Sequence, residues 1–305
     1  MSAGGIAIAL GTALVLLAGP LAFALAGWRR ARRTRGAAAP HVAWNARLTL
    51  LSALLYTLAF NLIFFVQELF LVLPKALTPG LSATLFHNDH RWQGEHPLAR
   101  LFQGTGVLAT LIVALACMAL LRSSRVRSTA WRLLLVWMAY CGAFMALPQL
   151  VVGALSGGSD VGMAMDYLRL NAATKTAIAL LALAAMPPLA LWLVRELLRL
   201  ADAAASIDGV GARTRFVFRV ATVPLLLSLL PIVAFRVPRE WIEVIVVPLV
   251  VAAIGLVWMQ AGAWRVGAVP ARGHGQPLPL AWPAAAVLAL LLLFQCVLRP
   301  GVTFG

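Results

Sequence analysis

The chain has 305 residues, of which 62% are hydrophobic and 11% charged, and its mean hydropathy is +0.91. A soluble globular domain carries about 25% charged residues, so this composition excludes a soluble protein and indicates an integral membrane protein. The formal net charge of +15 would suit a nucleic-acid partner only if the basic residues were interleaved with exposed aromatic or polar groups. They lie instead in short connections, so we expect membrane lipid as the partner and no nucleic acid.

Eight apolar segments are long enough to cross the hydrocarbon core as helices, which takes about 20 residues. They predict an all-α, polytopic membrane protein in which residues 1–305 form a single transmembrane helical-bundle domain. The predicted spans are residues 4–28, 48–73, 97–121, 133–152, 172–194, 216–235, 241–262 and 280–298. The first span has no basic residue before it and five arginines soon after it, which favours a retained helix over a signal peptide.

The basic residues are distributed unevenly between the two sides of this bundle. Seventeen of the 25 lysines and arginines, but only three of the ten acidic residues, lie in every second connection. By the positive-inside rule these connections face the cytoplasm. Both termini and the connection at residues 75–97 are then extracytoplasmic, and we expect a protein of the bacterial cytoplasmic (inner) membrane.

Proline recurs within the predicted spans, for example at Pro20, Pro148 and Pro224. It removes a backbone donor and clashes with the preceding helical turn, so we expect it to break several helices. Pro187 and Pro188 in particular are expected to interrupt the fifth span. Kinked helices of this kind can enclose a polar cavity.

The extracytoplasmic connection at residues 75–97 gathers three of the five histidines into ten positions. His87 and His90 are three residues apart, so on a helical turn both rings would project from one face, as two metal ligands must. His96 precedes a proline at the expected start of the third span, where a neutral imidazole is favoured. These residues, with Asp89, predict a site for a divalent, zinc-like metal, although the HxxH spacing alone is a weak signature.

Two other interpretations of this connection stay open. It is also typical of an interfacial loop anchored by Trp92 or, less so, of an element whose histidines respond to pH. Asp89 and Glu95 would serve in the metal interpretation either as further ligands or as acceptors that orient the imidazole rings.

Glu68 lies within the second predicted span, where an acidic side chain costs roughly 2.5–3.5 kcal/mol at mid-bilayer and less toward the interface. Thr57, Asn61 and Glu68 fall within about 40° of one another on a helix with 100° per residue. We expect this polar stripe to face a cavity inside the bundle. The alternative is a structural role for Glu68, either at the interface or paired with Lys75.

Other polar residues occur on the same side of the predicted bundle. Gln103 follows the start of the third span, and Asn171 and Lys175 stand at the start of the fifth, so we expect all three to line the cavity. Arg239 and Glu243 are four residues apart and are expected to form a structural ion pair.

Three functions are compatible with this pattern. The first is a metal-dependent membrane hydrolase acting on a lipid or lipid-linked substrate, with Glu68 or Glu95 as the general base. The second is an ion or proton transporter or channel that uses the polar stripe, which the scarcity of polar residues toward the other side disfavours. The third is a non-catalytic membrane subunit or sensor that uses the histidine-rich connection.

Overall fold

The computed structural model describes residues 2–33, 44–123, 126–239, 241–273 and 275–304. Within these residues, eight helices are long and apolar enough to cross a membrane. All eight coincide with the predicted spans, so the prediction of a multi-pass helical membrane protein is confirmed. The spans are Ala3–Arg33, Ala46–Ala76, Ala99–Arg122, Thr129–Leu155, Ala172–Leu198, Val210–Arg236, Glu243–Arg265 and Ala281–Leu298.

Several spans are built from more than one helical segment. In chain order the helices of the spans are α1 (Ala3–Ala13), η1 (Leu14–Ala18), α2 (Gly19–Arg33), α3 (Ala46–Ala76), α4 (Ala99–Phe102), α5 (Thr105–Arg122), α6 (Thr129–Leu155), α8 (Ala172–Leu198), α9 (Val210–Val217), η3 (Phe218–Thr222), α10 (Val223–Arg236), η4 (Ile242–Val246), α11 (Val247–Gly262), η5 (Ala263–Arg265), α12 (Ala281–Leu292) and η6 (Leu293–Leu298). The connections add α7 (Asp160–Tyr167) and η2 (Ala204–Ile207), together with the strands β1 (Ser82–Leu85), β2 (His90–Gln93) and β3 (Val302–Phe304).

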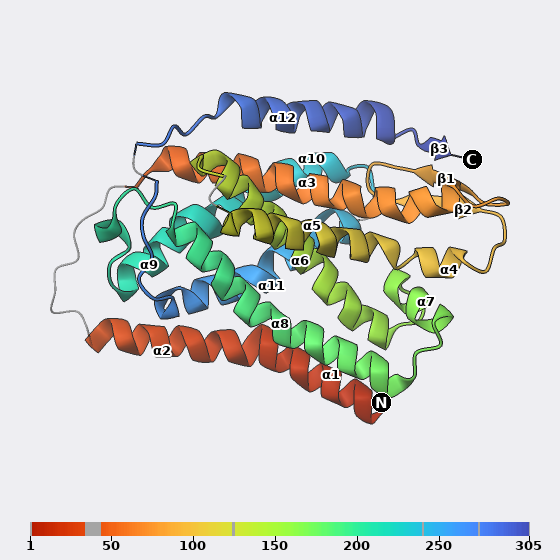
Figure 1. Cartoon of the computed structure of the whole chain (residues 1–305), viewed down its shortest axis with the longest axis horizontal. Helices are drawn as coiled ribbons and strands as arrows, with labels where there is room; N and C mark the ends of the chain where they lie inside the picture. Colours follow the sequence, from red (N-terminus) through yellow and green to blue (C-terminus); the bar gives the residue numbers. More distant parts are fainter. Residues whose placement is uncertain (1, 34–43, 124–125, 240, 274, 305) are drawn as a thin grey trace.

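The two ends of the bundle differ in what they carry. Figure 1 shows both chain termini, the three strands, α4 and α7 at one end, which we call the hairpin end. The C-terminal part of α2 and helix α9 lie at the opposite end, which we call the arginine-rich end (Figure 1). The alternation of basic connections along the sequence thus corresponds to two physically separate ends.

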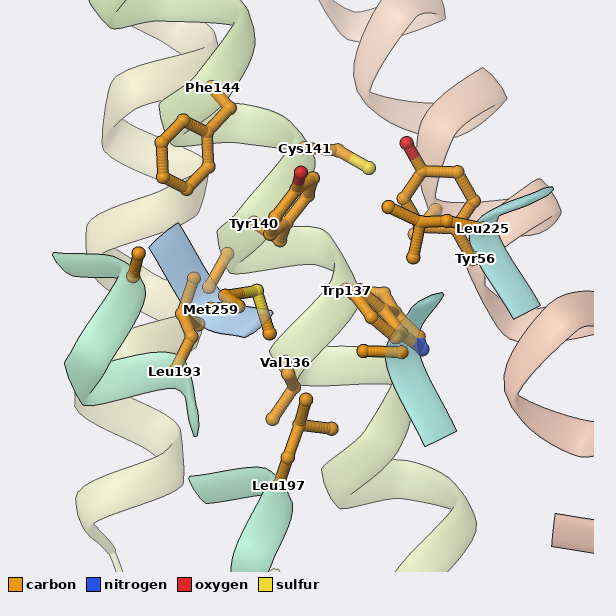
Figure 2. Close-up of a cluster of buried hydrophobic side chains, with 14 of the residues drawn as sticks. Tyr56, Val136, Trp137, Tyr140, Cys141, Phe144, Leu193, Leu197, Leu225 and Met259 are labelled. Carbon is orange, nitrogen blue, oxygen red and sulfur yellow. The ribbon is translucent and has the colours of Figure 1, made fainter. Parts of the chain in front are cut away.

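Aromatic side chains fill the middle of the bundle. Tyr56 of α3 and Trp137, Tyr140 and Phe144 of α6 are fully buried, each with 0% exposure. Figure 2 shows them with aliphatic side chains of neighbouring helices around them. Their ring centroids lie 5.2 Å apart for Tyr56 and Trp137 and 4.8 Å apart for Tyr140 and Phe144. The centre of the molecule is therefore a packed apolar core.

Proline modifies the helices differently from the expectation that it breaks them. Helix α6 continues through Pro148, and α8 continues from Ala172 to Leu198 through Pro187 and Pro188. The expected interruption of the fifth span was therefore wrong, because a helix surrounded by other helices tolerates proline when the freed groups find other partners.

Four spans accommodate a proline by widening the turn before it. Within the described residues, each π-helical segment ends two residues before a proline; these segments are η1, η3, η4 and η6, and the prolines are Pro20, Pro224, Pro248 and Pro300. The proline ring crowds the carbonyl one turn earlier and supplies no N–H group. A π turn with i→i+5 bonds relieves this crowding without ending the helix.

Side chains of neighbouring helices bond the carbonyl oxygens that a proline cannot serve. Pro224 has no N–H to donate toward the preceding turn, and the carbonyl oxygen of Val220 accepts from Ser52 Oγ at 2.6 Å. The carbonyl oxygen of Arg219 accepts from Thr49 Oγ1 at 2.9 Å. These bonds also attach η3 to α3.

A small antiparallel sheet closes the hairpin end, in a region where the sequence did not indicate strands. The strand order is β2-β1-β3, so the last residues of the chain pair with β1. Successive residues of a strand point to opposite faces, so Ala83 and Leu85 are buried against the bundle while Thr84 is partly exposed. On β2 the same period turns His90 and Trp92 inward and leaves Arg91 exposed.

The two ends of the bundle should be reactive from opposite sides of the membrane. In a Cys296→Ala background, which removes the exposed native thiol, a cysteine replaces either Gln93 at the hairpin end or Gly267 at the arginine-rich end, both exposed. An impermeant thiol reagent applied to intact cells should label Gln93→Cys at once and Gly267→Cys only after permeabilisation, because arginine-rich connections stay inside. The reverse order of labelling would invert the orientation.

Candidate functional site

Glu68 is paired with a histidine from the hairpin. Its carboxylate oxygen Oε2 lies 2.9 Å from His90 Nδ1, and both side chains are only 8% exposed. Glu68 comes from the C-terminal third of α3, and His90 reaches it because the β2 pleat turns that ring inward. The pair therefore fastens the hairpin to the bundle and compensates the buried carboxylate.

An amide completes the chain of hydrogen bonds. Gln103 Oε1 lies 3.1 Å from His90 Nε2 and accepts from Lys75 Nζ at 3.1 Å, so the ammonium group fixes which amide atom faces the ring. Both ring nitrogens of His90 thus meet acceptor oxygens. Because Gln103 Oε1 can only accept, Nε2 of His90 is the donor toward it, and Nδ1 shares a proton with the Glu68 carboxyl group.

Trp92 covers this chain of polar groups. Its ring stacks on that of His90, with centroids 5.9 Å apart and an interplanar angle of 14°. The Lys75 ammonium lies 4.7 Å from the centroid of the same indole and also donates to the carbonyl oxygen of Leu71 at 2.7 Å. Lys75 has 0% exposure, so these contacts replace water around its charge.

A second set of contacts ties the hairpin turn to the segment after α10. Asn88 donates through Nδ2 to the carbonyl oxygen of Arg236 at 2.6 Å and accepts from Arg239 Nε at 3.0 Å. Arg239 is also paired with Asp89 and lies 3.5 Å from Glu243 Oε2. The predicted pair of Arg239 and Glu243 is confirmed, and Asp89 shares the same guanidinium group.

His87 and Arg236 each have buried side-chain nitrogen atoms that lack a hydrogen-bond partner. Among the described residues, both ring nitrogens of His87 and the Nη1 atom of Arg236 are buried and unbonded. The Arg236 guanidinium lies 4.4 Å from the Phe64 ring centroid, and its Nε donates to the carbonyl oxygen of Glu243 at 2.7 Å. Arg236 Nη1 is thus a buried donor that a bound group could use.

The surroundings of His87 disfavour its charged form. Burial lowers the pKa of the imidazole, and the positive charges of Arg239, Arg299 and Arg236 lower it further. The carbonyl oxygen of Arg236 acts in the opposite direction, although it does not have the geometry of a hydrogen bond to the ring. His87 is therefore held neutral.

Asp160 at the start of α7 is a neighbour that sequence reasoning missed. Burial raises the pKa of its carboxyl group, the charges of His90 and Lys75 oppose that rise, and Glu68 adds to it. Asp160 therefore interacts electrostatically with the Glu68–His90 pair. In the sequence, Asp160 stands out only as an acidic residue after a Gly-Gly-Ser turn. That pattern does not indicate which residues of the second span lie near it.

The predicted metal ligands do not converge. His87 and His90 lie in a hairpin turn and a strand, so the expected helical turn was wrong; His90 faces Glu68 and His87 faces the arginines. His96 Nδ1 accepts from the Leu98 backbone N–H at 3.2 Å, and Glu95 is exposed. Within the described residues no group of three histidine, cysteine, aspartate or glutamate side chains can hold one metal ion. The zinc-like site stays a prediction.

The remaining predicted cavity residues divide between the site and the helix ends. Gln103 belongs to the hydrogen-bonded chain described above. Asn171 caps α8 by accepting from the Thr174 backbone N–H at 2.9 Å, and Lys175 pairs with Asp166. In α3, Asn61 Nδ2 donates to the carbonyl oxygen of Thr57 at 2.8 Å, and both residues are buried.

Breaking the buried pair should destabilise the protein strongly. His90→Leu leaves the buried carboxyl group of Glu68 without its partner, so we expect a loss of about 3–5 kcal/mol in the free energy of unfolding in detergent. The double variant Glu68→Gln/His90→Leu leaves no unpaired charge and should lose less than the single variant. Arg91→Ala, on the exposed face of the same strand, serves as the control with a loss below about 0.5 kcal/mol. Equal losses for His90→Leu and Arg91→Ala would contradict the pairing.

Lowering the pH should destabilise the folded protein, because acid favours protonation of His87. The unfolded chain takes up a proton near the usual value of 6.5, whereas the folded protein resists it. Stability from this group is therefore present above about pH 6.5 and lost as the pH falls. The thermal midpoint of the wild type should drop more between about pH 7.5 and about pH 5 than that of His87→Leu, and parallel pH profiles would refute this role.

Comparison with known proteins finds no matching family model, no matching curated protein and no matching solved structure. The molecule's function must therefore be inferred from the chemistry of its own side chains. The chain is a multi-pass helical membrane protein with a buried acid–base pair at its hairpin end.

Proposed function

We propose that the protein is a membrane enzyme that uses Glu68 and His90 as an acid–base pair at one side of the membrane. The observation that carries the proposal is the 2.9 Å contact between His90 Nδ1 and the Glu68 carboxylate. A carboxylate that holds one imidazole nitrogen leaves the other nitrogen to exchange a proton with a reacting group. Intramembrane ionisable residues are more often functional than structural because they are costly to retain.

The reaction class that suits this pair is hydrolysis of a lipid or lipid-linked ester. His90 Nε2 would give its proton to the leaving oxygen as water attacks the substrate, and the proton that the water loses would return to Nε2. Gln103 now occupies the position of the substrate against Nε2, so binding has to displace this amide. Arg236, whose charge interacts with that of Glu68, offers its unbonded Nη1 to a developing negative charge.

The depth of the pair favours a substrate that arrives from the membrane. Glu68 and Lys75 belong to the last turns of the second span, near the level at which lipid headgroups begin. Trp92 above them is an aromatic side chain of the kind enriched at that level. The hairpin would act as a cover that moves when substrate enters.

The apolar core argues against the alternative of an ion or proton path through the bundle. The stripe of Glu68, Asn61 and Thr57 leads toward Tyr56, Trp137 and the other buried rings in Figure 2. A conducting path needs polar groups or water along its whole length. Below Thr57, the hydroxyl groups of Ser52 and Thr49 are bonded to the carbonyl oxygens of Val220 and Arg219.

One observation favours a second candidate, a non-catalytic subunit or sensor. Glu68, His90, Gln103 and Lys75 form a continuous chain of hydrogen bonds, as a structural fastening of the hairpin would. In that case the hairpin, with its exposed Arg91, would be the part that meets a partner.

Activity measurements on the two acid–base residues separate these candidates. Vesicles carrying a phospholipid with a fluorogenic acyl ester, and a second set with a fluorogenic phosphodiester, are incubated with the purified protein. One of them should be hydrolysed, and Glu68→Gln or His90→Gln should lower kcat about 100-fold or more, while Arg91→Ala retains activity.

Three outcomes of this experiment bear on the proposal. Absence of turnover on both substrates would favour the subunit or sensor. Variants that hydrolyse at the wild-type rate would exclude the pair from catalysis. Loss of activity on chelation, together with stoichiometric metal in the purified protein, would restore the predicted metal site.

A further inference from the structure

A groove at the arginine-rich end is separate from the Glu68–His90 pair. It has a volume of about 390 Å³, which is within the range of small-molecule sites. It is formed where the start of α3, the junction of α9 with η3 and the end of α11 meet. Its lining residues are Trp44, Thr214, Arg215, Phe218, Arg219 and Gln260.

The groove lies at the level where the membrane meets water. Trp44 comes directly before the residue that caps α3, and Arg215 lies near the start of the span Val210–Arg236. Gln260 belongs to the last turns of the span Glu243–Arg265. Trp44 and Phe218 are 50% and 46% exposed, as expected of aromatic side chains among lipid headgroups.

The charges that line the groove are positive. Arg215 and Arg219 are four residues apart on consecutive helical turns, so both guanidinium groups lie on the groove's side. Arg219 lies 5.5 Å from the Trp44 ring centroid. Among the described residues that line the groove, none is acidic. Two guanidinium groups beside exposed aromatic rings suit a phosphate attached to an apolar chain.

Hydrogen bonds to neighbouring helices preform the wall of the groove. Gln260 accepts from Thr222 Oγ1 at 2.8 Å and donates to the carbonyl oxygen of Thr214 at 3.2 Å. The backbone of Arg219 is held by Thr49, as described for η3. The site therefore does not have to be ordered by its ligand, which reduces the cost of binding.

We propose that this groove binds the headgroup of an anionic phospholipid. Arg215 and Arg219 contact the phosphate, and Trp44 and Phe218 lie along the glycerol and the first part of the acyl chains. Charge complementarity and the level of the groove identify this occupant, because basic sites between membrane helices at the arginine-rich side attract anionic headgroups. This inference does not depend on the proposed enzymatic function.

Lipid binding to the purified full-length protein tests the proposal. Native mass spectrometry in a nonionic detergent is used to measure binding of phosphatidylglycerol, with phosphatidylcholine as the uncharged comparison. Each basic residue near an anionic headgroup contributes roughly fivefold, so Arg215→Ala/Arg219→Ala should bind phosphatidylglycerol about 25-fold more weakly than the wild type. Arg215→Gln alone, at an exposed position, should bind about fivefold more weakly and cannot fail through misfolding of a buried contact.

A charge-matched variant distinguishes the groove from net charge. Arg29→Ala/Arg33→Ala removes two exposed arginines from α2 at the same end of the bundle and should bind like the wild type. Equal losses in the two double variants would overturn the proposal. Equal binding of phosphatidylcholine would also overturn it, and displacement of the lipid by millimolar inorganic phosphate would assign the site to free phosphate.

Discussion

The structure depends on one constraint, which is that polar groups inside a membrane must be bonded by the protein because water is absent. The prolines illustrate this constraint, because proline has no backbone N–H to donate to the carbonyl oxygen one turn earlier. Ser52 bonds the carbonyl oxygen of Val220 before Pro224, and Gln295 bonds that of Ala234, one turn before Pro238. Such bonds cross between helices, so at these two prolines they also help to determine which helices pack together and in which register.

Charged groups obey the same constraint at a higher cost. The Glu68–His90 pair lies at the hairpin end, and Arg132 and Glu196 form a pair of 2.8 Å at the arginine-rich end, with side chains only 4% and 2% exposed. Both pairs lie near the ends of spans, where desolvation costs less than at mid-membrane. The middle is left to the rings of Figure 2. This separation places each charged pair toward one end of the bundle, which supports the proposed enzyme over a conducting path.

Hydropathy was sufficient to predict the eight spans, because a run of about 20 apolar residues is the length that a transmembrane helix needs. The site was harder to predict, because its geometry depends on a local period. On a helix, His87 and His90 would lie on the same face. In the hairpin, the strand period of two places His90 on the same face as Trp92, and His87 lies in the turn before the strand. Polar residues such as Asn88 and Arg91 obscured the strand pattern. Asp160 could not have been linked to Glu68, since no sequence rule relates a short helix after the fourth span to the second span.

Helices α3 and α10 connect the two ends of the molecule. Helix α3 has 31 residues and is about 46 Å long at 1.5 Å per residue; it bonds η3 through Thr49 at one end and His90 through Glu68 at the other. The span that contains α10 begins with the arginines of the groove and ends at Arg236. Ser228 Oγ joins the two helices between these points by donating to the carbonyl oxygen of Ala53 at 2.8 Å. Packed helices shift as rigid elements, so a displacement of one against the other would alter the lipid groove and the acid–base pair together. This interface is one physical route by which a lipid in the proposed groove could influence the Glu68–His90 pair.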